Sequence, residues 1–90
     1  MGIEVKAKYQ VGEILNCRGK VGRITEIGLG YPNGAENEMM CYYLEIIGEN
    51  DEIFNEPRTE VFAISYADRV FKTADPMAQI LFNNGEEQNE

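Results

Sequence analysis

The chain has 90 residues, 43% of them hydrophobic, and a formal net charge of −8 without any histidine. This length supports one small domain with a single core, because a chain of this size buries roughly 60% of its surface on folding. The lack of histidine removes the commonest general base and the commonest metal ligand, so we expect no enzyme, no catalytic or metal site and no cofactor.

The first third of the sequence predicts a β-hairpin preceded by a strand or an extended arm. Residues 3–9 alternate between apolar and polar side chains, as a half-buried strand does. Strands are then expected over 13–17 and 21–27, joined by a tight turn at 18–20. The apolar residues of the second strand are spaced by three, and a bulge near Gly22 would return them to one face.

Residues 28–38 predict a loop, because glycine, proline and asparagine are concentrated there. Within it, residues 31–34 are expected to form a β-turn in which Pro32 presets φ and Asn33 tolerates the left-handed region. Eleven residues are long for a hairpin connection, so the loop is either mobile or functional.

The strongest strand signal lies at residues 39–47, which are apolar on both faces apart from Glu45 and therefore predict a central strand. This run is also too short to cross a membrane, so we expect no membrane insertion. Residues 52–55 predict a short fourth strand. We expect it to end at Pro57, which has no N–H to donate to a ladder.

The last third predicts a closing strand and a helix. Residues 61–64 fit a strand or a buried turn, and residues 69–72 fit a closing strand. A short helix follows, with Asp75 as its N-cap, Pro76 at its first position and Gly85 just past its end.

These elements predict a mainly β fold: a small SH3-like, five-stranded open barrel with a short C-terminal helix. Residues 1–84 form the single domain, and residues 85–90 are expected to be a disordered acidic tail. The helix carries apolar side chains at Met77, Ile80 and Leu81, which would either plug one end of the barrel or pack against a second copy. The plug is favoured, and with it a monomer.

Two cysteines and the N-terminal sequence bear on the location of the protein. The first residues lack the apolar stretch of a signal peptide, so a cytoplasmic location is expected. If the strands form a meander, Cys17 and Cys41 lie roughly 9–10 Å apart, beyond disulfide reach. We predict two free, buried or half-buried thiols.

The glycine and isoleucine spacing of the hairpin resembles two families of SH3-like barrels. The Gly-x-x-Gly-x-Ile core of KOW modules, found in translation and transcription factors, matches Gly19, Gly22 and Ile24. KOW modules that bind RNA are basic, whereas this chain is acidic.

The second resemblance is to the RNA-polymerase-interacting domain of CarD-like regulators and transcription-repair coupling factors. Its Val-Gly opening, Gly-x-Gly-x-Ile stretch and strand with paired aromatics are set against residues 11–12, 21–24 and 42–46 of this chain. CarD-like proteins carry a further helical domain, whereas one short helix is expected here. The two resemblances cover roughly residues 9–57 and imply a regulator that contacts transcription or translation machinery.

Three functions remain open, and they differ in the surface they use. The leading one is a non-enzymatic module that binds a protein through a sheet edge or an aromatic groove. The second is nucleic-acid contact through Arg18, Lys20 and Arg23. It is disfavoured because binding a phosphate backbone needs concentrated cationic surface.

The third function is an acidic inhibitor that imitates nucleic acid and occupies a basic groove of another protein. This hypothesis rests on the charge of residues 36–60, which carry eight acidic residues and one basic residue. It requires the carboxylates of this segment to share one surface: Glu36, Glu38, Glu49, Asp51, Glu52, Glu56 and Glu60. The predicted partner-binding residues of the three hypotheses together are Arg18, Lys20, Arg23, Tyr31, Tyr42, Tyr43, Glu49, Asp51 and Glu52.

Overall fold

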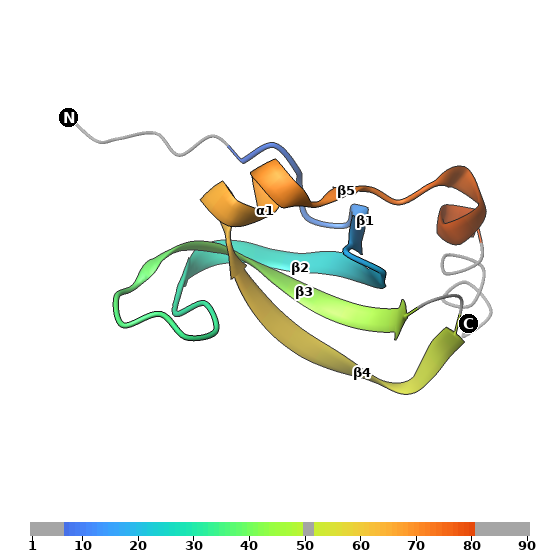
Figure 1. The fold of residues 1–90 in the computed structure, drawn as a ribbon, viewed down its shortest axis with the longest axis horizontal. Helices are drawn as coiled ribbons and strands as arrows, with labels where there is room; N and C mark the ends of the chain where they lie inside the picture. The colour runs from blue at the N-terminus through green and yellow to red at the C-terminus, as the bar shows by residue number, and fades with distance from the viewer. Residues whose placement is uncertain (1–6, 50–51, 81–90) are drawn as a thin grey trace.

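One antiparallel sheet of five strands organises the structure, a computed structural model that describes residues 7–49 and 52–80 (Figure 1). Across the sheet the strands are β4 (Glu52–Ala63), β3 (Met39–Glu49), β2 (Lys20–Gly30), β1 (Ile14–Cys17) and β5 (Lys72–Thr73). Helix α1 (Ile64–Val70) connects β4 to β5. The mainly β prediction is confirmed. Within the described residues the sheet is open, since no ladder joins its edge strands β4 and β5.

The β1–β2 hairpin turns on two residues with positive φ, Arg18 at 58° and Gly19 at 97°. This is the geometry of a type I′ turn, whose twist matches that of the flanking strands. Asn16 Oδ1 accepts the Gly19 N–H at 3.0 Å and closes the turn. The predicted bulge is confirmed: the register between β2 and β3 shifts at Val21/Gly22. A Cβ at Gly22 would lie 2.9 Å from Ile46 Cδ1, so a larger residue there would displace this buried side chain.

Strand β3 is central, as predicted, with β2 and β4 on its two sides. Its side chains at Tyr42, Leu44 and Ile46 are fully buried in the core, while Tyr43 and Glu45 lie on the other face, half-exposed. The main core consists of the buried residues Tyr9, Leu15, Cys17, Ile24, Tyr42, Leu44, Ile46, Ile64, Ala67 and Phe71. Both cysteines are free and buried, which confirms the prediction for the thiols.

The prediction that pairing ends before Pro57 is wrong, because β4 continues through it to Ala63. Ile46 pairs with Arg58 and Gly48 pairs with Ile53, so four residues of β4 (54–57) face the single residue Ile47 of β3. Pro57 lies in this irregular segment of an edge strand, where no ladder requires its missing N–H.

The predicted closing strand over 69–72 is also wrong in its bounds, because residues 69 and 70 belong to α1. The helix buries Ile64 and Ala67, and Phe71 follows one turn later in the same core. Only Lys72–Thr73 pair with β1 as β5. No side-chain hydrogen bond caps the helix at Ala63, so the sequence carries no start signal for it.

Residues 7–10 pack as an arm on the face of the sheet that α1 also covers (Figure 1). Tyr9 is buried, its hydroxyl donates to Phe71 O at 3.0 Å, and its N–H donates to Tyr42 Oη at 3.0 Å. Of the two predicted forms for residues 3–9, the described part therefore adopts the extended arm. Residues 1–6 lie outside the described residues.

The C-terminal helix begins as predicted. Residues 76–80 are helical, and Asp75 Oδ1 accepts the Ala78 N–H at 2.8 Å, which makes Asp75 the N-cap. The predicted contact face is wrong where it is described, since Met77 is 74% and Ile80 is 59% exposed. Ala78 instead packs on a small second cluster of buried residues: Ile14, Val21, Ile47 and Ala74.

Several predictions for the end of the chain fall on residues 81–90, including Leu81, Gly85 and the acidic tail, and these lie outside the described residues. Within the described part of the chain, no helix combines the length and the apolar character needed to cross a membrane.

Candidate functional site

Two adjoining pockets form a groove between the 31–38 loop, the end of β4 and α1. The first, of about 400 Å³, is mainly apolar and is lined by residues 32–35, Met39, residues 61–63 and Tyr66. The second, of about 460 Å³, extends along β4 to Lys20, Tyr31 and Glu60. Both pockets share Asn33, Val61 and Phe62, so we treat them as one site, the loop groove.

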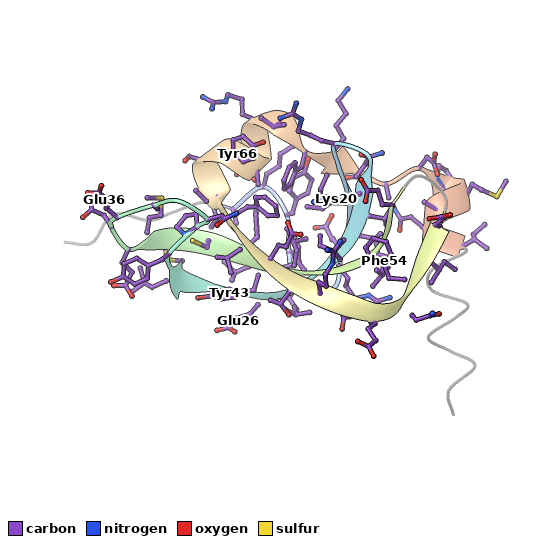
Figure 2. The ribbon with its side chains drawn as sticks, turned by 60° about the horizontal axis from the view of Figure 1, so that its bottom comes forward. Lys20, Glu26, Glu36, Tyr43, Phe54 and Tyr66 are labelled. Carbon is purple, nitrogen blue, oxygen red and sulfur yellow. The ribbon has the colours of Figure 1, made fainter. Side chains whose placement is uncertain are left out.

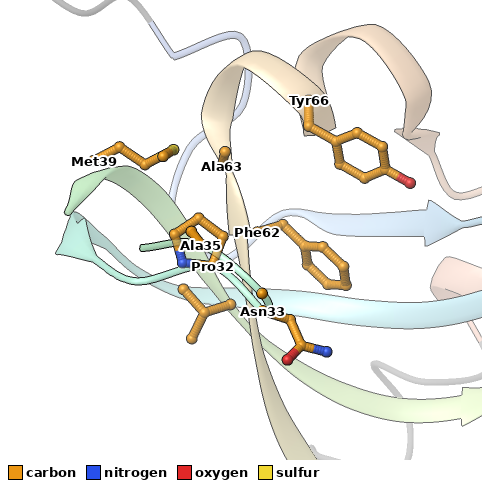
Figure 3. A pocket seen from close by; sticks show the side chains of 9 residues that line it. Pro32, Asn33, Ala35, Met39, Phe62, Ala63 and Tyr66 are labelled. Atoms are coloured by element: carbon orange, nitrogen blue, oxygen red, sulfur yellow. The ribbon is translucent and has the colours of Figure 1, made fainter. Parts of the chain in front are cut away.

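The wall of the apolar pocket is a cluster of three aromatic rings. Phe62 and Tyr66 stack with ring centroids 6.3 Å apart, and each lies nearly perpendicular to the Phe71 ring, with centroid distances of 4.9 Å and 5.6 Å. Phe71 is buried in the main core, so the two half-exposed rings rest on a fixed base. Figure 3 shows their side chains beside those of Pro32, Ala35 and Met39. Aromatic rings held in this way offer a large apolar contact surface with little entropy left to lose.

The opposite wall is the 31–38 loop, whose base and tip are held by hydrogen bonds. At the base, Tyr43 Oη donates to Leu29 O at 2.6 Å across Gly30. At the tip, Ala35 N–H donates to Pro32 O at 2.9 Å, and Gly34 takes a φ of 85°. The turn is therefore closed over 32–35, one residue later than predicted.

The second pocket is polar and contains an ion pair. Lys20 Nζ lies 3.5 Å from Glu60 Oε2, with the two side chains 34% and 30% exposed. Tyr31 lies at its rim and is 62% exposed. The groove thus runs from an apolar pocket to a polar end where charges of both signs meet.

Of the nine predicted partner-binding residues, the groove contains only Lys20 and Tyr31. Tyr43 supports the groove from below through its bond to Leu29. Glu49 pairs with Lys20 of β2 and with Glu52 of β4, but neither Glu49 nor Glu52 lines the groove, and Asp51 lies outside the described residues.

The prediction for Tyr42 is corrected by its burial, since a side chain that is 0% exposed cannot contact a partner. Its hydroxyl donates to Asp68 Oδ1 at 2.6 Å and accepts the Tyr9 N–H. Asp68 Oδ2 accepts the Lys8 N–H at 3.1 Å. Burial and the hydrogen bond to Asp68 raise the pKa of Tyr42 well above its ordinary value. Tyr42 therefore joins β3 to α1 and the N-terminal arm.

The three cations of the hairpin do not form one basic surface. Lys20 pairs with Glu60, and Arg23 Nη1 lies 3.7 Å from Glu45 Oε1 with its side chain 17% exposed. Arg18 is exposed in the turn and lines a different pocket. The geometry gives no support to phosphate-backbone contact by these residues acting together.

The acidic residues of the predicted set are spread along the length of the molecule. Glu36 lies in the 31–38 loop at one end of the long axis, and Glu49 and Glu52 lie at the other end, where β3 and β4 meet (Figures 1 and 2). Glu60 lies between them in its ion pair with Lys20. Imitation of nucleic acid needs closely spaced charges, and Glu36 lies at the opposite end of the sheet from Glu49 and Glu52.

Neither thiol has the properties of a nucleophile. Burial, followed by the negative charge of Glu60, raises the pKa of Cys17 from its ordinary 9.0 to about 12. Burial also raises the pKa of Cys41. A reactive cysteine requires the opposite shift, toward the thiolate.

The sequence reasoning missed Phe62, Met39 and Pro32 as site residues. Residues 61–64 predict a strand or a buried turn, and neither the length of β4 nor the presence of α1 follows from this pattern. The sequence feature that could have indicated these site residues is the apolar run at 61–64 followed by Tyr66. No family model, curated protein or solved structure matches this chain.

Proposed function

We propose that this chain is a non-enzymatic protein-interaction module that binds an apolar segment of another protein in the loop groove. The observation that carries the proposal is the apolar pocket of about 400 Å³ with Phe62 and Tyr66 as its wall. Its volume falls in the range of pockets that bind ligands, and its lining is mainly apolar with a polar end.

Contacts between distant strands support an SH3-like open barrel as the scaffold of this module. In a flat sheet the edge strands β4 and β5 would lie roughly 19 Å apart, four strand spacings. Instead, the ring of Phe62 on β4 lies 4.9 Å from that of Phe71, the residue before β5. Lys20 on β2 also reaches Glu60 on β4 across β3. Both contacts favour a sheet that curls until its edges approach each other.

The groove lies beside β4, an edge strand that belongs to no further ladder in the described structure. Partner segments commonly bind at such an edge, where backbone groups are free and alternate side chains find pockets. The resemblance of residues 9–57 to KOW and CarD-like domains supports a partner in transcription or translation machinery. We include a cytoplasmic, monomeric protein in this proposal, as expected from the sequence.

A displayed library of random peptides, selected on the whole chain, tests the proposal. We expect the selected peptides to share large apolar residues, and Phe62→Ala to weaken the best of them at least tenfold. Met39→Ala should weaken it as well, in a part of the pocket that contributes less to the core. Leu29→Ala, at an exposed apolar residue outside the groove, is the matched control and should leave the affinity unchanged.

The amide spectra of the variants must show that each of them folds. Peptides whose binding tolerates both groove substitutions but is lost in Leu29→Ala would show that the protein uses another surface.

A further inference from the structure

A third pocket lies at the other edge of the sheet and shares no lining residue with the loop groove. Its volume is about 330 Å³, and it lies between the β1–β2 turn, the end of α1 and β5. The residues that line it are Asn16, Arg18, Val70, Lys72, Thr73 and Asp75.

Two cations line this edge pocket. Asn16 and Lys72 are direct partners in the β1–β5 ladder, which places their side chains on the same face of the sheet. Arg18 follows two residues after Asn16. Among the described residues, Arg18 and Lys72 take part in no ion pair, whereas Lys20 and Arg23 do.

The backbone conformation at Arg18 does not favour an arginine at this position of the turn. Its φ of 58° lies in the left-handed region, which costs a residue with a Cβ roughly 1–2 kcal/mol. Asparagine is preferred at this position of a type I′ turn, before a glycine. A residue kept against its local preference often has a functional role, and here the side chain lines a pocket that holds a second unpaired cation.

Neutral donors accompany the cations. Asn16 Oδ1 accepts the Gly19 N–H, and the Nδ2 group of the same amide carries two N–H donors. Thr73 adds a hydroxyl. The carboxylate of Asp75 would repel a bound anion. However, it already accepts the Ala78 N–H, and the positive end of the helix that it caps partly neutralises its charge.

We propose that the edge pocket binds a single phosphate group, either free phosphate or the phosphate of a phosphorylated residue in a partner. Arginine binds phosphate oxygens in a bidentate manner, and lysine adds a point charge. The site is suited to one phosphate and not to a polyanion, because the chain as a whole carries −8 and would repel an extended phosphate backbone. This proposal does not depend on that for the loop groove.

Amide chemical shifts of the full chain, followed at constant ionic strength, test the site. The probes are inorganic phosphate, a short phosphoserine peptide and the same peptide without phosphate. We expect the first two to shift residues 16–19 and 72–73. Arg18→Asn keeps a residue suited to the turn, Lys72→Gln keeps a polar side chain on β5, and each should weaken phosphate binding about tenfold, the loss of one charge-assisted hydrogen bond.

Arg58→Gln removes the same charge on β4, outside the pocket, and should leave phosphate binding unchanged. A phosphopeptide that binds more tightly than inorganic phosphate would identify a phosphorylated partner, and equal affinities would identify free phosphate. The proposal is overturned if phosphate shifts no residue of the pocket, or if Arg58→Gln weakens binding as much as Arg18→Asn. Equal binding of both peptides without a response to phosphate would overturn it too.

Discussion

Tyr42 and Cys17 show how burial determines the role of single residues in this protein. The Tyr42 hydroxyl is the junction of three segments, because it donates to Asp68 of α1 and accepts the backbone N–H of Tyr9 in the arm. Cys17 lies in the same core with its pKa raised. Each leads to a prediction about stability.

Tyr42→Phe should lower the free energy of unfolding by about 2 kcal/mol, because it leaves the Tyr9 N–H without its buried acceptor and Asp68 Oδ1 without the Tyr42 hydroxyl as donor. Urea denaturation measures the effect. Tyr43→Phe is the matched control: it removes one hydroxyl whose bond to Leu29 O is exposed, so it should cost clearly less. Equal losses in the two variants would contradict the role of Tyr42 as the junction.

Stability should also fall at alkaline pH. The folded pKa of Cys17, about 12, exceeds its ordinary value of 9.0, so the folded state holds the proton more tightly than the unfolded state. The resulting stabilisation is complete below pH 9 and is lost as the pH rises toward 12, by up to about 1.4 kcal/mol per pH unit. Tyr42, whose pKa is also raised, adds to the loss at still higher pH.

Unfolding measured across this range should therefore show a shallower decline in Cys17→Ala than in the wild type, whatever the absolute stability of the variant. Parallel declines would mean that ionisation of Cys17 does not contribute.

At the scale of elements, the sequence predicted what local chemistry determines. The hairpin, its bulge at Gly22 and the helix start at Asp75 each have a signal within a few residues: glycines at a bend, or a cap followed by proline. The length of β4 could not be predicted, because Pro57 is tolerated only through its place in an irregular segment of an edge strand. Helix α1 lacks a cap, and the core that stabilises it is formed by residues far away in the sequence.

The loop groove was beyond sequence reasoning for the same reason. Its two walls, the 31–38 loop and α1, are brought together by the sheet. Tyr31 and Lys20 could be predicted as partner-binding candidates, because aromatic residues are enriched at protein interfaces and lysine commonly contacts phosphate. Phe62 could not, because a phenylalanine in an apolar run indicates core.

The base of the 31–38 loop should depend on Gly30. A Cβ at this position would collide with the Tyr43 hydroxyl, so Gly30→Ala should displace that ring and break its bond to Leu29 O. We expect a loss of about 1–2 kcal/mol, typical of overpacking, together with weaker peptide binding in the groove. Gly28→Ala, whose Cβ would meet only the end of the Glu26 side chain at 3.6 Å, is the matched control. Equal effects of the two substitutions, in denaturation and in peptide affinity, would contradict this.

At the scale of the molecule, the acidic residues are spread along the length of the sheet, and the apolar pocket lies between the 31–38 loop, the end of β4 and α1. The acidic residues of the 31–38 loop and of the β3–β4 end lie far apart along a long axis of 44 Å, while the groove lies beside the edge strand β4. This arrangement favours a partner that inserts apolar side chains into the groove over one that matches a single charged face.

The C-terminal helix should stabilise the fold through Ala78. This residue packs on the second cluster, whereas its neighbour Met77 is exposed. Ala78→Asp should therefore lower Tm by several degrees, since about 1 kcal/mol corresponds to roughly 4–8 °C at this size, and Met77→Asp should change it little. Thermal unfolding at two protein concentrations should give the same Tm. A Tm that rises with concentration, or a larger effect of Met77→Asp, would indicate that this helix contacts a second copy.

The central claim, that the loop groove binds an apolar segment of a protein, is tested most directly by mapping a selected peptide on the whole chain with amide and methyl chemical shifts. We predict that the largest changes fall on residues 31–39, residues 61–63 and Tyr66, and that the Phe62 and Tyr66 rings show contacts to an apolar side chain of the peptide. Changes that instead cluster on Leu29 and the outer face of the sheet, with the groove resonances unmoved, would contradict the claim.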